Sequence, residues 1–284
     1  IIPGVRIPGS PFFLPLWYGV ISILIISIVH EFAHGVIGVL ENVKPKSSGF
    51  GLLAIIFSAF VEFDEESMRK ASKWSRIKIA AAGPTANIFF ALIFGFLVSI
   101  TLIPLVSSAT ELKGIEILST LEGYPAHKAN ITEGTIITKI NNQTIKTTED
   151  FANTFLSFSP GDNITLTDVN GKEYHVTLTH SPTNASLPYI GITHKQAITY
   201  KEGSKLPRPL YPILSWFLGL SVWMINLNLA VGLINFLPVW FADGGQILYN
   251  LVGLIIKDES RVTKIVSSIF FFSFSLLILN FILP

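Results

Sequence analysis

The sequence contains no cysteine, which excludes disulfide bridges and thiolate ligands and leaves His, Asp and Glu to bind any metal ion. Charge is also scarce. Asp, Glu, Lys and Arg make up 14% of the 284 residues and the net charge is +1, which argues against a nucleic-acid partner. Half of the residues are hydrophobic, and several apolar runs reach or approach the ~20 residues that a spanning helix needs. The composition therefore predicts a polytopic α-helical membrane protein.

Long apolar runs set the expected organisation. We predict four such elements, at 14–40, 77–106, 210–256 and 265–283, the third of them interrupted at Pro238. Segment 49–61 is also uniformly apolar, but as a helix it would span only about 20 Å of a ~30 Å hydrocarbon core. We therefore expect a re-entrant segment there, and its Ile, Phe and Gly content favours a β-hairpin over a short helix. A plain anchor at the membrane surface is the alternative. The chain begins at Ile1 without Met or a signal peptide, and we expect further segments upstream.

Residues 111–205 differ in kind, because they are polar and carry alternating, strand-like runs that end in a hairpin with Asn170-Gly171 at its tip. We predict an inserted α+β domain between two parts of a membrane core, 1–110 and 206–284. Four short motifs make the insert resemble a PDZ domain of the kind found in membrane proteases: Tyr124-Pro125-Ala126, Gly134-Thr135-Ile136-Ile137, Ile140-Asn141 and Pro160-Gly161-Asp162. Another small α+β module is the alternative.

Three ionisable residues, His30, Glu31 and His34, lie within five positions of the first apolar run. Each costs at least ~2.5 kcal/mol at mid-membrane, so the group needs a compensating partner. Positions i and i+4 share a helix face, so both imidazoles can reach one Zn²⁺ while Glu31 sits beside its open position. The candidate third ligand is Asp243. It lies in an apolar segment where a proline and a glycine pair interrupt the helix, so unwound backbone can present its carboxylate. Helix capping by Asp243 is the alternative.

Charge also predicts the orientation in the membrane. Connection 42–78 carries seven Lys or Arg residues near membrane ends, which makes it cytoplasmic by the positive-inside rule. One crossing by 77–106 then places 111–205 outside the cell, where four N-x-Ser/Thr sequons agree with that side. His34 lies ten residues before Lys44, or about 15 Å along a helix, so we expect the metal nearer the cytoplasmic face of the cell membrane.

The sequence contains a second motif besides the HExxH pattern at His30. This motif, NxxPxxxxDG, is matched from Asn235 to Gly244. With both motifs the chain resembles the site-two protease family of intramembrane zinc metalloproteases. Residues 82–87 resemble the family's third motif, and Pro3-Gly4-Val5 with Phe60-Val61-Glu62 resemble its archaeal and animal branch. The likeness covers nearly the whole chain, and it suggests an archaeal-like member with one inserted PDZ domain.

The resemblance implies a function and a site. It implies Zn²⁺ bound by His30, His34 and Asp243, with Glu31 as general base. Its substrates would be single-pass membrane proteins, cut within their transmembrane segments in regulated intramembrane proteolysis. The PDZ-like domain could contact a substrate ectodomain or another protein.

Two asparagines and two rival functions remain open. Asn87 and Asn235 lie in apolar elements and could hold substrate backbone or a developing oxyanion, or could bond one helix to another. An intramembrane zinc-binding transporter would place ionisable residues along a path, whereas here they gather at one depth. An inactive membrane PDZ receptor is the other alternative, and the intact Glu31 argues against it.

Overall fold

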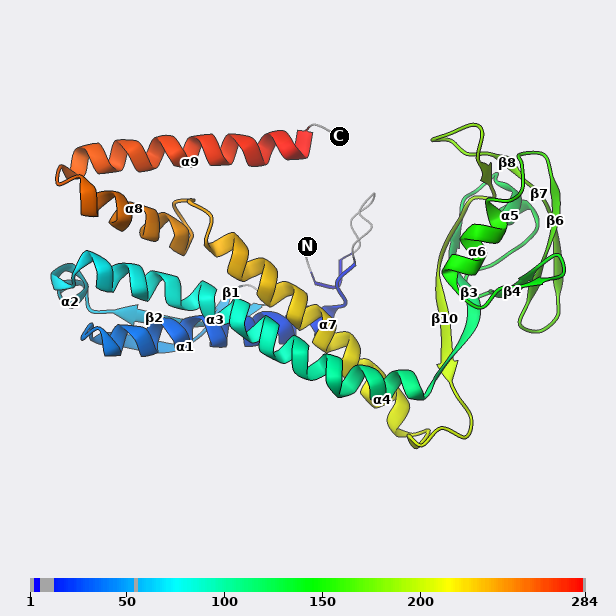
Figure 1. Ribbon diagram of the computed structural model, residues 1–284, viewed down its shortest axis with the longest axis horizontal. Helices are drawn as coiled ribbons and strands as arrows, with labels where there is room; N and C mark the ends of the chain where they lie inside the picture. Colours follow the sequence, from blue (N-terminus) through cyan, green and yellow to red (C-terminus); the bar gives the residue numbers. More distant parts are fainter. Residues whose placement is uncertain (1–2, 6–12, 54–55, 283–284) are drawn as a thin grey trace. The chain divides into compact units, whose positions relative to one another are not determined.

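The computed structural model describes residues 3–5, 13–53 and 56–282. The chain divides into two compact units, a helical unit of Ile1–Ile103 with Ile213–Pro284 and an inserted unit of Pro104–Pro212 (Figure 1). The predicted insert, 111–205, lies within the second unit.

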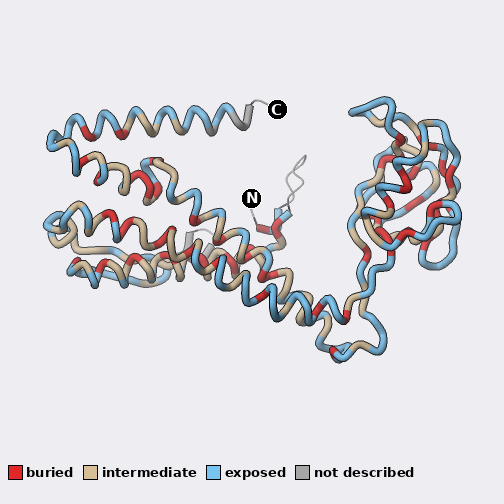
Figure 2. Tube along the Cα trace, in the orientation of Figure 1, coloured by how far each residue is buried: buried red, intermediate tan, exposed pale blue. Residues whose placement is uncertain are grey.

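Seven helices of the described chain lie before residue 110 or after residue 200: α1 (Leu16–Leu40), α2 (Glu65–Lys70), α3 (Lys73–Ile100), α4 (Leu102–Ser108), α7 (Leu210–Asn235), α8 (Asp243–Ile255) and α9 (Glu259–Ile282). Within the described residues, three segments are long and apolar enough to cross a membrane: Leu16–Leu40, Lys73–Ser108 and Leu210–Asn235. Much of the surface of α1 and α3 is exposed or half-buried (Figure 2). Large apolar side chains contribute to it, among them Phe32, Phe89 and Phe96. Such surfaces suit contact with lipid.

Local capping explains where α2 and α3 begin. The Asp64 carboxylate accepts a hydrogen bond from the Ser67 N–H, and the Ser72 hydroxyl accepts one from the Ser75 N–H. Because Ser72 caps α3, the helix starts at Lys73, four residues before the predicted start at 77.

Segment 49–61 lies within a hairpin of two antiparallel strands, β1 (Pro45–Leu53) and β2 (Ile56–Phe63). The strands extend beyond the apolar run because their polar ends also pair. Lys46 Nζ lies 2.6 Å from Glu62 Oε1, and this hydrogen bond lowers the pKa of the Glu62 carboxyl. β2 packs along α1 (Figure 1). The re-entrant course of the hairpin stays a prediction.

Small residues let the long helices approach one another. Gly232 of α7 faces α3, and a Cβ there would lie 2.9 Å from the Pro84 carbonyl oxygen. On another face of α7, a Cβ at Gly219 would lie 2.7 Å from the Tyr18 hydroxyl of α1. α3 also packs against both α1, which carries His30 and His34, and α8, which begins at Asp243.

The inserted unit contains β3 (Thr110–Thr120), α5 (Pro125–Lys128), β4 (Ile136–Ile140), β5 (Gln143–Thr144), α6 (Thr148–Phe155), β6 (Asn163–Asp168), β7 (Glu173–Thr177), β8 (Thr179–His180), β9 (Pro188–Tyr189) and β10 (Ile192–Tyr200). Its main sheet has the order β10-β3-β4-β6-β7, with β5 paired to β4, and all pairs are antiparallel. Buried isoleucines such as Ile115 and Ile137 form its core. The sequence prediction ended at the β6–β7 hairpin and did not include β10, which pairs with β3.

Candidate metal centre

Three side chains from two helices meet in the helical unit. His30 and His34 lie on one face of α1, and Asp243 is the first residue of α8; one donor atom from each lies within 4.8 Å of the others. The separations are 3.0 Å from His30 Nε2 to Asp243 Oδ2 and 3.5 Å from His34 Nε2 to Asp243 Oδ1. A tetrahedral Zn²⁺ with bonds of about 2.0–2.2 Å needs donors about 3.3–3.6 Å apart. The cluster is therefore close to the spacing that one zinc ion requires.

The non-helical turn 236–242 delivers Asp243 to this cluster. Gly244 and Gly245 are buried against the backbone carbonyls of Leu237 and Val239, and a side chain at either glycine would strike those oxygens. The turn can therefore fold onto the start of α8 only with glycine at both positions. The N-cap of α8 is Ala242, so Asp243 does not cap the helix, but it lies in the first turn, where the helix dipole favours a carboxylate.

Hydrogen bonds behind the imidazoles orient them. The His34 Nδ1–H donates to the carbonyl oxygen of Ile79 over 2.7 Å, which leaves Nε2 free to bind a metal ion. His30 Nδ1 lies 3.1 Å from the Asn87 amide nitrogen, while the Asn87 Oδ1 is buried and has no hydrogen-bond partner within the described part of the chain. Turning the amide by 180° lets Oδ1 accept from His30 Nδ1–H and leaves His30 Nε2 free, so we assign that orientation.

The hydrogen bond between Asn87 and His30 favours the interhelical role of Asn87 over the predicted contact with substrate. Asn87 is fully buried and bonds α3 to a histidine of α1, which is the interhelical alternative. Asn235 is the last residue of α7 and lies half-buried at the start of the 236–242 turn. The structure therefore places the two asparagines in different surroundings.

Gly83 of α3 provides the space for the cluster. A Cβ at this position would lie 2.5 Å from His34 Nε2 and 2.6 Å from His30 Nε2. Only glycine lets α3 pass this close to both ligand atoms. Gly83 belongs to the 82–87 motif, but the sequence alone assigned it no role.

Glu31, the acidic residue of the HExxH motif, lies half-buried next to His30. Its Oε2 accepts a hydrogen bond of 3.0 Å from the backbone N–H of Val61 in β2. One helical turn earlier, the Ser27 hydroxyl accepts a hydrogen bond of 3.0 Å from the N–H of Ala59. Sequence reasoning missed Ser27, although its spacing of i−4 from Glu31 places it on the same helix face.

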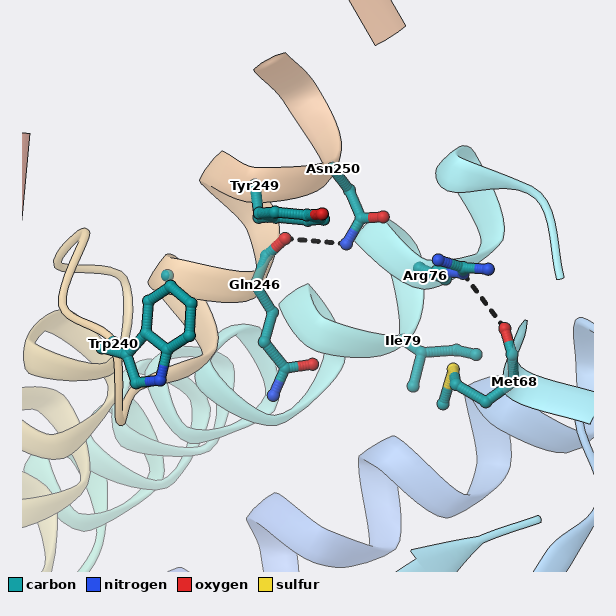
Figure 3. Close-up of a pocket in the computed structure, with 8 residues that line it drawn as sticks. Met68, Arg76, Ile79, Trp240, Gln246, Tyr249 and Asn250 are labelled. Atoms are coloured by element: carbon teal, nitrogen blue, oxygen red, sulfur yellow. Dashed lines mark hydrogen bonds between the residues drawn. The ribbon is translucent and has the colours of Figure 1, made fainter. Parts of the chain in front are cut away.

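A cavity of about 340 Å³ adjoins the ligand-bearing segments (Figure 3). Ile79, whose carbonyl holds His34, and Gly245, two residues after Asp243, both line it. The remaining lining residues are Met68, Arg76, Trp240, Gln246, Tyr249 and Asn250. The wall is thus mostly apolar, with the amide side chains of Gln246 and Asn250 in it.

A family model described as Peptidase family M50 matches residues 18–279. The chain belongs to peptidase family M50, the site-two protease family. It is also 29% identical over 255 residues to an uncharacterized protein of Methanocaldococcus jannaschii, a match that covers 87% of this chain and 60% of that protein. This chain therefore spans about 60% of the length of that curated relative.

Two solved structures resemble part of the chain. One is the PDZ domain of an SdrC-like protein from Listeria monocytogenes, with 24% identity, coverage of 29% of this chain and 87% of that chain, and a TM-score of 0.26. The other, from Listeria innocua, has 28% identity, coverage of 28% and 92%, and a TM-score of 0.26. Scores this low do not establish the fold of the insert. Family membership and the three apolar helices together support an integral membrane protein of this peptidase family.

Proposed function

We propose that this M50 protein is an intramembrane zinc metalloprotease that hydrolyses peptide bonds within transmembrane segments of single-pass membrane proteins. The observation that carries the proposal is the cluster of two buried histidines, His30 and His34, with the half-buried Asp243, and Glu31 follows His30 in the chain. Two imidazoles and one carboxylate match the three protein ligands of a catalytic zinc site.

Each residue has a distinct task. A bound Zn²⁺ would lower the pKa of its water molecule toward neutrality and so supply a nucleophile. The Glu31 carboxylate accepts a proton from the attacking water and returns it to the leaving amine. Asn87 and the Ile79 carbonyl bind the Nδ1 side of the two imidazoles, which would leave each Nε2 free to hold the metal ion.

A helical substrate must unwind before it is cut, and in hydrocarbon its freed N–H and C=O groups need new partners. The edge of β2 that is not paired with β1 could supply these partners by strand addition. The N–H groups of Ala59 and Val61 turn toward α1 and away from β1, so they belong to this edge. The alternative is that the hairpin only anchors the protein at the membrane surface.

The remaining parts of the proposal concern place and partners. The inserted unit would lie outside the cell, with the metal centre nearer the cytoplasmic face of the cell membrane and with lipid around α1, α3 and α7. The insert would act as a PDZ-like domain that contacts a substrate ectodomain or another protein.

Incubating the purified full-length protein with a single-pass substrate, with and without a zinc chelator, tests the function. We expect cleavage within the transmembrane segment, loss of cleavage on chelation and recovery when zinc is restored. Zinc transport into liposomes without any cleavage would favour the transporter instead.

A further inference from the structure

The edge of β2 that faces α1 is already hydrogen-bonded. Val61 donates to Glu31 Oε2 and Ala59 donates to the Ser27 hydroxyl, each over 3.0 Å. Successive donors on one strand edge are about 6.6 Å apart, and helix residues four apart are separated by about 6 Å. One face of α1 can therefore provide acceptors for both N–H groups at once. One of these acceptors is Glu31, the proposed general base.

Ser27 is itself fixed, because its hydroxyl donates to the carbonyl oxygen of Leu24 over 3.0 Å while it accepts from Ala59. The Val61 side chain meanwhile packs against Gly35, where a Cβ would lie 3.6 Å from Val61 Cγ2. Ser27 thus aligns β2 with α1, and the alignment brings the Val61 N–H to the Glu31 carboxylate.

We propose that the Val61 N–H holds Glu31 away from the attacking water until an extended substrate strand takes over that N–H. Ser27 is the positioning residue that keeps β2 in register for this exchange. The inference rests on the proposed function, and it specifies which chains are cut: those that can present backbone carbonyls in extended form to Val61 and Ala59.

The exchange follows from the hydrogen bonds alone. A substrate strand that pairs with this edge needs the donors that Glu31 and Ser27 now use, so these acceptors must leave. The incoming carbonyl replaces the carboxylate on the Val61 N–H, and no buried donor is left unpaired. Glu31 then turns to the water beside it. A substrate that stays helical presents no free carbonyl, so it leaves Glu31 held.

Two matched proline variants separate this role from simple anchoring. Val61→Pro and Ala59→Pro each remove one donor from the same edge and neither donor faces β1, so the β1–β2 ladder is spared. Only Val61→Pro releases Glu31. Zinc-loaded full-length protein in nanodiscs is assayed on a single-pass transmembrane substrate and on a blocked dipeptide that cannot reach both donors.

Both variants should cut the transmembrane substrate about tenfold more slowly, as expected for one lost hydrogen bond. On the dipeptide, Val61→Pro should be faster than both the wild type and Ala59→Pro, because only this variant releases Glu31. Equal behaviour of the two variants on the dipeptide, or no gain in Val61→Pro, overturns the proposal. Replacing Val61 by its α-hydroxy analogue, which removes only the N–H, repeats the test if proline unfolds the hairpin.

Amide hydrogen exchange provides a readout that does not depend on activity. In Glu31→Ala the Val61 amide should exchange faster and the Ala59 amide should not, whereas Ser27→Ala should speed exchange at both amides because it also loosens the alignment of β2. Adding an extended peptide to Glu31→Ala should protect Val61 again. A peptide that binds and leaves Val61 unprotected contradicts the exchange. If the proposed function fails, the wild type shows no zinc-dependent cleavage, and this exchange pattern is still measurable.

Discussion

Replacing Gly83 by Ala tests the geometry of the metal centre with one methyl group. The added Cβ would lie 2.5 and 2.6 Å from the two Nε2 atoms, whereas ordinary heavy-atom contact needs about 3.5 Å. Both imidazoles, or α3 itself, must therefore retreat by about 1 Å. Metal–ligand distances tolerate only about 0.2 Å, so we expect zinc affinity to fall by at least ~100-fold.

The assay is zinc content after dialysis against a competing chelator, followed by thermal unfolding of each variant. Gly95→Ala is the matched control on the same helix, because its Cβ would meet Ile225 at 3.6 Å, an ordinary contact. Alanine is about 1 kcal/mol better than glycine within a helix, so neither change weakens α3 by propensity. If Gly83→Ala holds zinc as tightly as the wild type, the two imidazoles do not meet the metal where the structure places them.

Three further predictions follow from the site and the topology. Asp243→Ala should lower the zinc bound per protein, because it removes one of three ligands, and full occupancy would send the search to another residue. Asn87→Leu should weaken zinc binding by about 10–100-fold, since His30 loses its acceptor, while Asn87→Asp should retain most of the affinity; equal affinity in all three proteins would remove Asn87 from the centre. An impermeant thiol reagent applied to intact cells should label Lys172→Cys and not Lys73→Cys, and the opposite pattern would invert the orientation; the native chain has no cysteine to interfere.

The sequence predicted most where the signal is local. The HExxH spacing places two imidazoles on one helix face whatever surrounds them, and a proline with a glycine pair marks the break that exposes Asp243. The family assignment, which rested on these motifs, is confirmed by the match over residues 18–279.

The rest depends on contacts between distant segments. Asn87 reaches His30 across 57 positions, and its role follows only from how α3 crosses α1. In a strand such as β2, every second residue directs its backbone N–H away from the paired strand. Only the packing of β2 on α1 shows that Ala59 and Val61 are such residues. β10 was missed for a similar reason, because its pairing with β3 joins the two ends of the insert.

The most direct test of the account is Glu31→Gln in the purified, zinc-loaded protein. The amide keeps the shape of the side chain but cannot accept a proton at neutral pH. We therefore predict full zinc content and cleavage of the single-pass substrate reduced by ~10² or more. Near-normal cleavage with zinc retained would contradict the assignment of Glu31 as the base and with it the proposed mechanism.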